Sequence, residues 1–141
     1  MGLSARLTKR TPSNARGPGV ARIFLLEDEP LVRALLCRLL ASAGHDVLDA
    51  DDPATLCNLV TLFEADIVIA DIMLLGQDSL AAICDMRRSF PEVPLIIMSG
   101  GDPAELGERL HRSGLRRAVW LLPKPFSPDE LLDLLETVPA G

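Results

Sequence analysis

The chain has 141 residues, of which 48% are hydrophobic, enough for the core of one domain. Residues 1–22 hold five basic residues and no acid, whereas residues 23–141 hold 9 basic and 20 acidic residues. Such an acidic body disfavours nonspecific binding to nucleic acid and favours a divalent cation. No run reaches the roughly 18 apolar residues of a membrane span, and no secretory signal is recognisable. We therefore expect a cytoplasmic protein.

Residues 1–21 are rich in Arg, Ser, Pro and Gly and show no hydrophobic periodicity. This composition favours a flexible basic N-terminal arm, since it offers too little apolar surface to pack. An arm that binds phosphate or a partner is the alternative. The folded domain is expected to follow, over residues 22–139.

From Ile23 onward, short apolar runs alternate with segments of helical periodicity. The runs are apolar throughout, as strands covered by helices on both faces must be. Prolines mark several helix starts. The predicted strands are 23–26, 46–49, 66–70, 94–98 and 118–122. The first predicted helix has Pro30 in its first turn, apolar positions from Leu31 to Leu40, and Gly44 as its stop. Further helices are predicted at about 53–63, 79–89, 103–113 and 128–138. Strict alternation of five strands and five helices specifies a doubly wound, parallel α/β sheet.

Acidic residues follow two of these strands directly. Glu27, Asp28 and Glu29 come after the first strand, and Asp71 comes after the third. Parallel strands of one sheet place their carboxyl ends at the same edge, where open α/β sheets bind ligands. Carboxylates in such a group are hard oxygen ligands of the kind that Mg²⁺ prefers. The sequence therefore predicts a magnesium site at this edge.

Two further strand ends carry groups that suit phosphoryl transfer. Ser99 follows the fourth strand and supplies a hydroxyl, and Lys124 follows the fifth and supplies an ammonium. A phosphoryl group in transit spreads negative charge over its oxygens, so a metal, a hydroxyl donor and a lysine all stabilise it. Asp71 can then act as the nucleophile and become an aspartyl phosphate. Each of these residues taken alone is more simply explained as a helix cap, a turn residue or a solvated charge. The interpretation as a phosphoryl-transfer site rests on their joint occurrence after four strands.

These motifs resemble the response-regulator receiver domain of bacterial two-component signalling, over roughly residues 22–139. The resemblance rests on four stretches of sequence, which are Phe24–Pro30, Asp66–Leu74, Ser99 and Lys124–Phe126. It implies a flavodoxin-like (βα)5 fold with strand order 2-1-3-4-5. It also implies that Asp71 is the phosphoacceptor and that Lys124 precedes a cis proline.

The same resemblance implies the roles of the remaining site residues. Glu27, Asp28 and Asp71 would hold Mg²⁺ together with the backbone carbonyl of Met73. Ser99 would be the switch hydroxyl and Lys124 the phosphoryl contact.

Several positions depart from the family pattern. Leu75 stands where Pro is usual and Ser79 where Gly is usual, which predicts a different path for the loop after Asp71. Leu121 stands at the position of the switch aromatic, and Trp120 lies one residue earlier. In a regular strand Trp120 points to the opposite face, so only a bulge would let it replace the aromatic; otherwise it is a packing residue.

The expected function is that of a stand-alone single-domain response regulator. Its phosphoryl donor would be a histidine kinase or a histidine phosphotransfer protein, and its output would be a protein contact or a relay step. Only 15 residues follow Phe126, so we expect no effector domain and no DNA binding. No membrane association is expected, and the family allows a homodimer.

Two alternatives belong to other classes. A phosphorylation-independent binding module, or pseudo-receiver, would retain the fold and not the switch. A phosphatase of the haloacid-dehalogenase type would need a second Asp two residues after the nucleophile, where this chain has Met73. Because neither Met73 nor Gly101 can orient or deprotonate water, we expect the aspartyl phosphate to hydrolyse slowly.

Overall fold

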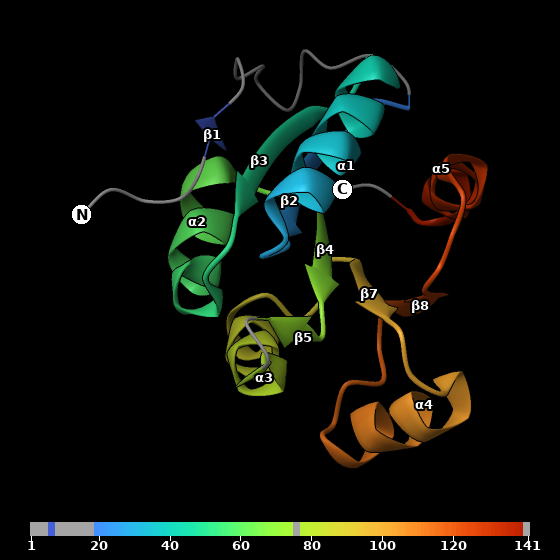
Figure 1. Ribbon diagram of the computed structural model, residues 1–141. Coiled ribbons are helices and arrows are strands. Elements are labelled where there is room, and N and C mark those ends of the chain that lie inside the picture. The colour runs from blue at the N-terminus through green and yellow to red at the C-terminus, as the bar shows by residue number, and fades with distance from the viewer. Residues whose placement is uncertain (1–5, 8–18, 75–76, 140–141) are drawn as a thin grey trace.

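Five parallel strands form the centre of the computed structural model, which describes residues 6–7, 19–74 and 77–139 (Figure 1). They are β2 (Arg22–Leu26), β3 (Asp46–Ala50), β4 (Ile67–Asp71), β7 (Leu95–Ser99) and β8 (Val119–Pro123). Their spatial order is β3-β2-β4-β7-β8, and every neighbouring pair among them is parallel. The predicted order 2-1-3-4-5 is therefore confirmed, with each predicted strand within one residue of its observed start.

The helices are α1 (Pro30–Ser42), α2 (Leu56–Phe63), α3 (Leu80–Ser89), α4 (Pro103–Arg112) and α5 (Pro128–Thr137). The segment predicted as a helix from residue 53 begins with a 3₁₀ turn, Pro53–Thr55. Proline stands in the first turn of three of the five helices, where its missing N–H is not needed. No helix within the described ranges is long and apolar enough to cross a membrane.

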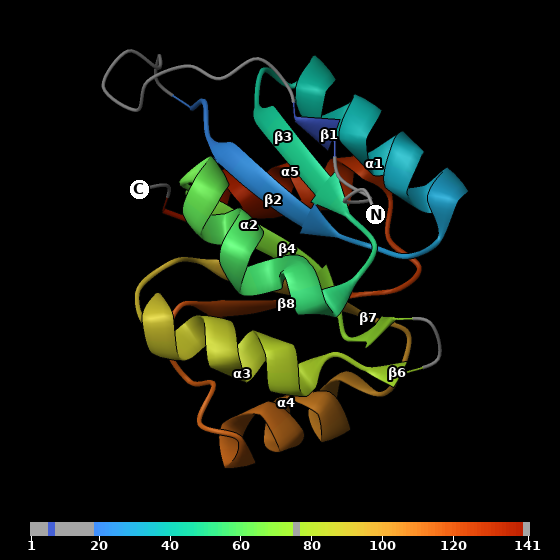
Figure 2. The ribbon, with the colours of Figure 1, turned by 90° about the vertical axis from the view of Figure 1, so that its left-hand side faces the viewer.

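The helices cover both faces of the sheet, which explains why its strands are apolar throughout (Figures 1 and 2). Leucines of α1 and α5 pack with one set of strand side chains, which includes Ile23 and Leu25. Side chains of α2, α3 and α4 pack with the alternate set, which includes Phe24 and Leu26. The period-two alternation of side chains along β2 thus divides the core into two layers.

One described segment of the N-terminal arm extends the sheet. The short strand β1 (Arg6–Leu7) pairs antiparallel with β3, with Arg6 opposite Asp49 and Leu7 opposite Leu48. The sheet consequently has a sixth strand that the sequence analysis missed. The expectation of a flexible arm over residues 1–21 otherwise concerns residues that mostly lie outside the described ranges.

The loop after Asp71 contains a short antiparallel pair of strands. β5 (Met73–Leu74) pairs with β6 (Gln77–Asp78), with Met73 opposite Asp78. Leu75, which stands where the family usually has Pro, lies outside the described residues. This pair brings the chain from the end of β4 to the start of α3.

The register of the sheet sets the positions of the site residues. Leu26 of β2 pairs with Ala70 of β4, so the residues that follow both emerge side by side. Ser99, the last residue of β7, pairs with Pro123 at the end of β8. All four strands therefore end at one edge of the sheet, as the doubly wound arrangement predicts.

Candidate functional site

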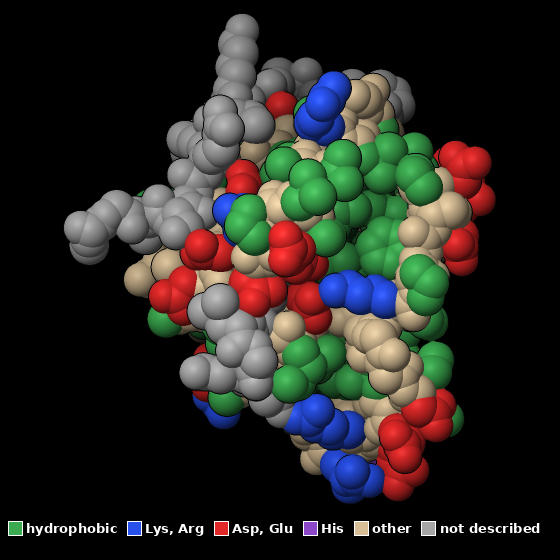
Figure 3. Space-filling view, in the orientation of Figure 1, with side chains coloured by type: hydrophobic (Ala, Val, Ile, Leu, Met, Phe, Trp, Pro, Cys, Tyr) green, Lys and Arg blue, Asp and Glu red, His purple; other side chains and the backbone are tan. Residues whose placement is uncertain are grey.

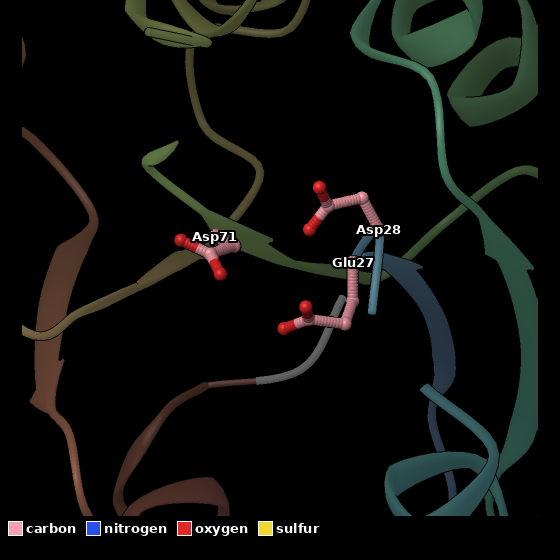
Figure 4. A group of neighbouring side chains, drawn as sticks. All are labelled: Glu27, Asp28 and Asp71. Carbon is pink, nitrogen blue, oxygen red and sulfur yellow. The ribbon is translucent and has the colours of Figure 1, made fainter. Parts of the chain in front are cut away.

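Three carboxylates converge at this edge of the sheet. Glu27 and Asp28 follow β2 and point toward Asp71, the last residue of β4 (Figure 4). One oxygen from each residue lies within 4.8 Å of the others. The space-filling view shows acidic side chains gathered beside a basic one on this face (Figure 3). The predicted convergence of the three acids is thus present in the structure.

Glu27 is buried and only partly satisfied by hydrogen bonds. Its Oε2 accepts a hydrogen bond from the backbone N–H of Glu29 at 3.1 Å, whereas its Oε1 is buried with no hydrogen-bond partner. Burial raises the pKa of the Glu27 carboxyl above its ordinary value, although the Glu29 N–H and the charge of Lys124 oppose the shift. A buried, partly unsatisfied carboxylate of this kind is poised to bind a cation.

Arg33 on α1 binds the backbone of Glu27, a contact that the sequence analysis missed. Its Nη1 donates to the backbone carbonyl of Glu27 at 3.0 Å, and its Nε donates to Asp49 Oδ2 at 3.1 Å. Asp49, near the end of β3, is 7% exposed. The arginine therefore links the β2 end to the β3 end. The signal available in the sequence was an arginine one turn into the first helix, six residues after Glu27.

Asp71 uses both carboxylate oxygens. Its Oδ1 accepts a hydrogen bond from the backbone N–H of Met73 at 3.0 Å, and its Oδ2 lies 2.6 Å from Lys124 Nζ. The side chain is buried at the end of β4. These two contacts fix the rotation of the carboxylate, so that its orientation is defined before any ligand binds.

Lys124 reaches Asp71 from the far side of the sheet edge. Its backbone N–H donates to the carbonyl of Ser99 at 2.7 Å, which continues the β7–β8 ladder past Pro123. The Lys124–Pro125 peptide bond is cis, as the family resemblance implies. Burial alone would lower the pKa of Lys124, yet its hydrogen bond to Asp71 and the charges of Asp71 and Glu27 raise it above the ordinary value. The ammonium is therefore fully charged at neutral pH.

Ser99 completes the group at the end of β7. Its Oγ accepts a hydrogen bond from the backbone N–H of Gly101 at 3.2 Å. Ser99, Asp71 and Lys124 line a common cavity of about 590 Å³, with the first two turns of α4 as its other wall. Met73 lines the same cavity and is 48% exposed. The cavity gives a small anion access to all three polar side chains.

The donor set fits a hard divalent cation. Glu27, Asp28 and Asp71 offer three carboxylates within reach of one ion, and one oxygen of Glu27 is buried without a hydrogen-bond partner. Oxygen ligands of this type suit Mg²⁺, which binds through a few carboxylates and retains several waters. The residues present therefore fit the Mg²⁺ that the sequence predicts.

The two candidate switch residues lie on opposite faces of β8. Leu121 packs with the cluster that includes the α4 residue Leu106, whereas Trp120 packs with the cluster of α1 and α5. The register from Val119 to Pro123 is regular against β7, so the strand has no bulge that turns Trp120 toward Ser99. An aliphatic side chain thus stands on the Ser99 side of the strand.

The fold and the site together define a class: a doubly wound α/β protein with a carboxylate cluster, a hydroxyl and a lysine at the carboxyl edge. Comparison with known families is consistent with that class. The model of the response regulator receiver domain matches residues 23–136, and the chain belongs to this family. Receiver domains are phosphoacceptor domains of two-component signalling, which distinguishes them from typical enzymes.

The curated relatives are response regulators. The DNA-binding transcriptional regulator NtrC of Rhizobium meliloti is 25% identical over 115 residues, covering 82% of this chain and 23% of that protein. Protein PetR of Rhodobacter capsulatus is 30% identical over 110 residues, covering 78% of this chain and 45% of that protein. The chain thus matches less than half of the length of either relative.

Solved structures agree on the fold. The chemotaxis protein CheY4 of Vibrio cholerae superposes with a TM-score of 0.76 at 21% identity, covering 85% of this chain and 99% of that one. NtrX of Brucella abortus superposes with a TM-score of 0.73 at 27% identity, covering 84% of this chain and 27% of that one. The shared region is the doubly wound domain.

Proposed function

We propose that this receiver domain accepts a phosphoryl group on Asp71, from a phosphohistidine of a histidine kinase or a phosphotransfer protein. The observation that carries the proposal is the convergence of Lys124 and two further carboxylates on Asp71. The Asp71 carboxylate is paired with Lys124 and oriented by the Met73 N–H, and it lies beside a cavity open to solvent. Those are the requirements for a carboxylate nucleophile.

In the proposed reaction a carboxylate oxygen of Asp71 attacks phosphorus, and the bond between phosphorus and the histidine nitrogen breaks. The histidine, protonated on its other ring nitrogen in the phosphohistidine, leaves as neutral imidazole, and an acyl phosphate forms on Asp71. Lys124 and Ser99, which line the same cavity as Asp71, would contact the equatorial oxygens, on which negative charge accumulates. Mg²⁺ bound by Glu27, Asp28, Asp71 and the carbonyl of Met73 would supply further charge neutralisation.

The phosphorylated domain would then signal by a protein contact or pass the phosphoryl group along a relay. The specific observation that favours a second function, the pseudo-receiver, is the aliphatic Leu121 on the Ser99 side of β8. A domain without an aromatic on that side can bind a partner without a phosphorylation-driven rearrangement. The two functions make opposite predictions for phosphoryl uptake.

The test is labelling by acetyl phosphate with and without Mg²⁺, followed by intact-mass measurement. Wild type, Asp71→Ala and the control Asp85→Ala are compared; Asp85 is an exposed α3 residue paired with Arg88. We expect one Mg²⁺-dependent phosphoryl adduct in wild type and in the control, and none in Asp71→Ala. Absence of an adduct from all three proteins would favour the pseudo-receiver.

A further inference from the structure

Ser79 makes an unusual set of contacts for the residue that precedes a helix. It is 1% exposed, and its Oγ donates to the backbone carbonyl of Asp71 at 2.8 Å and lies 3.0 Å from that of Ile72. Its backbone N–H also donates to the Ile72 carbonyl, at 2.9 Å. Ser79 is therefore attached at two atoms to the end of the strand that carries the proposed phosphoacceptor.

The direction of these bonds is opposite to that expected from the position in the chain. Ser79 is the N-cap of α3, where a serine side chain ordinarily accepts a hydrogen bond from the first turn of its own helix. No such capping bond forms here. The hydroxyl instead acts as a donor to the preceding strand, so helix capping does not explain why a buried hydroxyl stands at this position.

The segment that Ser79 holds contains three functional backbone or side-chain groups. Asp71 carries the carboxylate nucleophile, Met73 N–H orients that carboxylate at 3.0 Å, and the Met73 carbonyl is the proposed fourth ligand of Mg²⁺. The β5–β6 pair follows, with Met73 opposite Asp78, and it brings Ser79 back beside Ile72. The hydrogen bonds of Ser79 to the Ile72 carbonyl join the end of this loop to its beginning.

We propose that Ser79 is a positioning residue that holds the backbone from Asp71 to Met73 in the geometry required for Mg²⁺ binding, an inference that rests on the proposed function. The hydroxyl acts from the loop end and needs no contact with the ion or the phosphoryl group.

The test compares Ser79→Ala and Ser79→Gly with wild type. Ser113→Ala is the matched control, since the hydroxyl of Ser113, the exposed C-cap residue of α4, also donates to a backbone carbonyl, that of Arg109. Mg²⁺ affinity is measured by titration calorimetry, and amide exchange of Met73 and Ser79 is measured by NMR in metal-free protein. Both readouts are taken well below the melting temperature of every variant, so that a general loss of stability does not contribute.

We expect the Mg²⁺ dissociation constant to rise about fivefold in both Ser79 variants, the change that loss of one ordinary hydrogen bond gives. Exchange of the Met73 amide should accelerate by a similar factor, with the β7 amides unchanged. Ser113→Ala should match wild type in both measurements. Mg²⁺ affinity and Met73 exchange within twofold of wild type in Ser79→Ala would overturn the proposal.

The two readouts also separate this proposal from the proposed function. Failure of the wild-type protein to bind Mg²⁺ would overturn the proposed function, and with it the metal-binding purpose assigned to Ser79. Amide exchange in metal-free protein would still decide the restraint itself. Accelerated Met73 exchange in Ser79→Ala would support it, and unchanged exchange would overturn it.

Discussion

Lys124 Nζ lies 2.6 Å from Asp71 Oδ2 and 3.7 Å from Glu27 Oε1, so one ammonium offsets the charge of two clustered carboxylates. The same two carboxylates belong to the group that fits a divalent cation. Lys124 and a bound cation would therefore interact with the same two carboxylates, and their positive charges would repel each other. We accordingly expect the affinity of the site for Mg²⁺ to depend on the charge of Lys124.

Replacing Lys124 with Gln should make Mg²⁺ bind more tightly, while phosphoryl uptake becomes slower. Removing the ammonium abolishes its repulsion of the ion, and even at a dielectric near that of bulk water this favours Mg²⁺ by about threefold to tenfold. Calorimetric titration of wild type, Lys124→Gln and the control Arg112→Gln checks this; Arg112 pairs with Glu108 on exposed α4. Weaker Mg²⁺ binding in Lys124→Gln would show instead that the lysine is needed to hold the carboxylates in place.

Glu27→Gln should stabilise the metal-free protein at neutral pH and weaken Mg²⁺ binding. Burial raises the pKa of Glu27, so its ionised form costs folding free energy that disappears as the pH falls through the raised folded value. Gln removes this cost, and the melting temperature at pH 7 in EDTA should rise by roughly 2 to 6 °C. The difference from wild type should shrink toward pH 5. A lower melting temperature at pH 7 would mean that attraction to Lys124 outweighs the burial cost.

The pH dependence of Mg²⁺ affinity follows from the same shift. Protons compete with the ion for Glu27, and the raised pKa brings that competition above the pH at which an ordinary glutamate titrates. Wild-type affinity should therefore decline as the pH is lowered from 7 toward 5, whereas Glu27→Gln should show a shallower decline. Parallel curves for the two proteins would contradict the assignment of the proton to Glu27.

The sequence predicted the convergence at the sheet edge because it depends on the order of strand ends alone. Asp71, Ser99 and Lys124 each follow an apolar run directly, so the fold class brings them together whatever the loops do. The contacts of Arg33 and Ser79 escaped prediction because they depend on where a helix or loop side chain points. The pairing of β1 with β3 was not predicted, because a strand of two residues is too short to show hydrophobic periodicity.

Met73 should determine how long the aspartyl phosphate lasts. Met73 lines the cavity beside Asp71, and a thioether can neither orient nor deprotonate an attacking water. Met73→Gln introduces a polar amide of similar length and should accelerate hydrolysis by about tenfold, which is less than the roughly 100-fold or more of general base catalysis because an amide can orient water and is not a base. Met73→Leu is the apolar control and should match wild type. Release of phosphate from labelled protein measures the rate, and a wild-type half-life of seconds would contradict the expectation.

Trp120 should report on folding and not on phosphorylation. Its side chain packs with α1 and α5 on the face of β8 away from Ser99 and α4. Trp120→Ala should lower the free energy of unfolding by about 2 kcal/mol or more, because it leaves a cavity in that layer. Trp120→Phe should recover most of the loss, and both variants should label with acetyl phosphate at the wild-type rate. Urea denaturation and intact-mass labelling provide the two measurements; slower labelling of folded Trp120→Phe would show a coupling that the strand register does not predict.

Arg87 should matter for stability at the end of the molecule remote from the site. Its Nη1 donates to the carbonyls of Phe90 and Val93, both at 2.8 Å, and its Nη2 donates to that of Ala118 at 3.2 Å. These bonds join the α3–β7 connection to the residue before β8, where Ala118 has a φ of 55°. The guanidinium thus satisfies three carbonyls that an aliphatic side chain would leave without their donors.

Arg87→Met should therefore lower the free energy of unfolding by about 2 to 4 kcal/mol, while Mg²⁺ affinity and labelling rate at low temperature stay at their wild-type values. Arg88→Met is the matched control, because the neighbouring Arg88 is exposed and pairs only within α3, with Asp85, in the described contacts. It should cost less than about 1 kcal/mol, as exposed ion pairs do. Equal losses from the two substitutions in urea denaturation would show that the three carbonyl contacts of Arg87 add nothing to the stability of this domain.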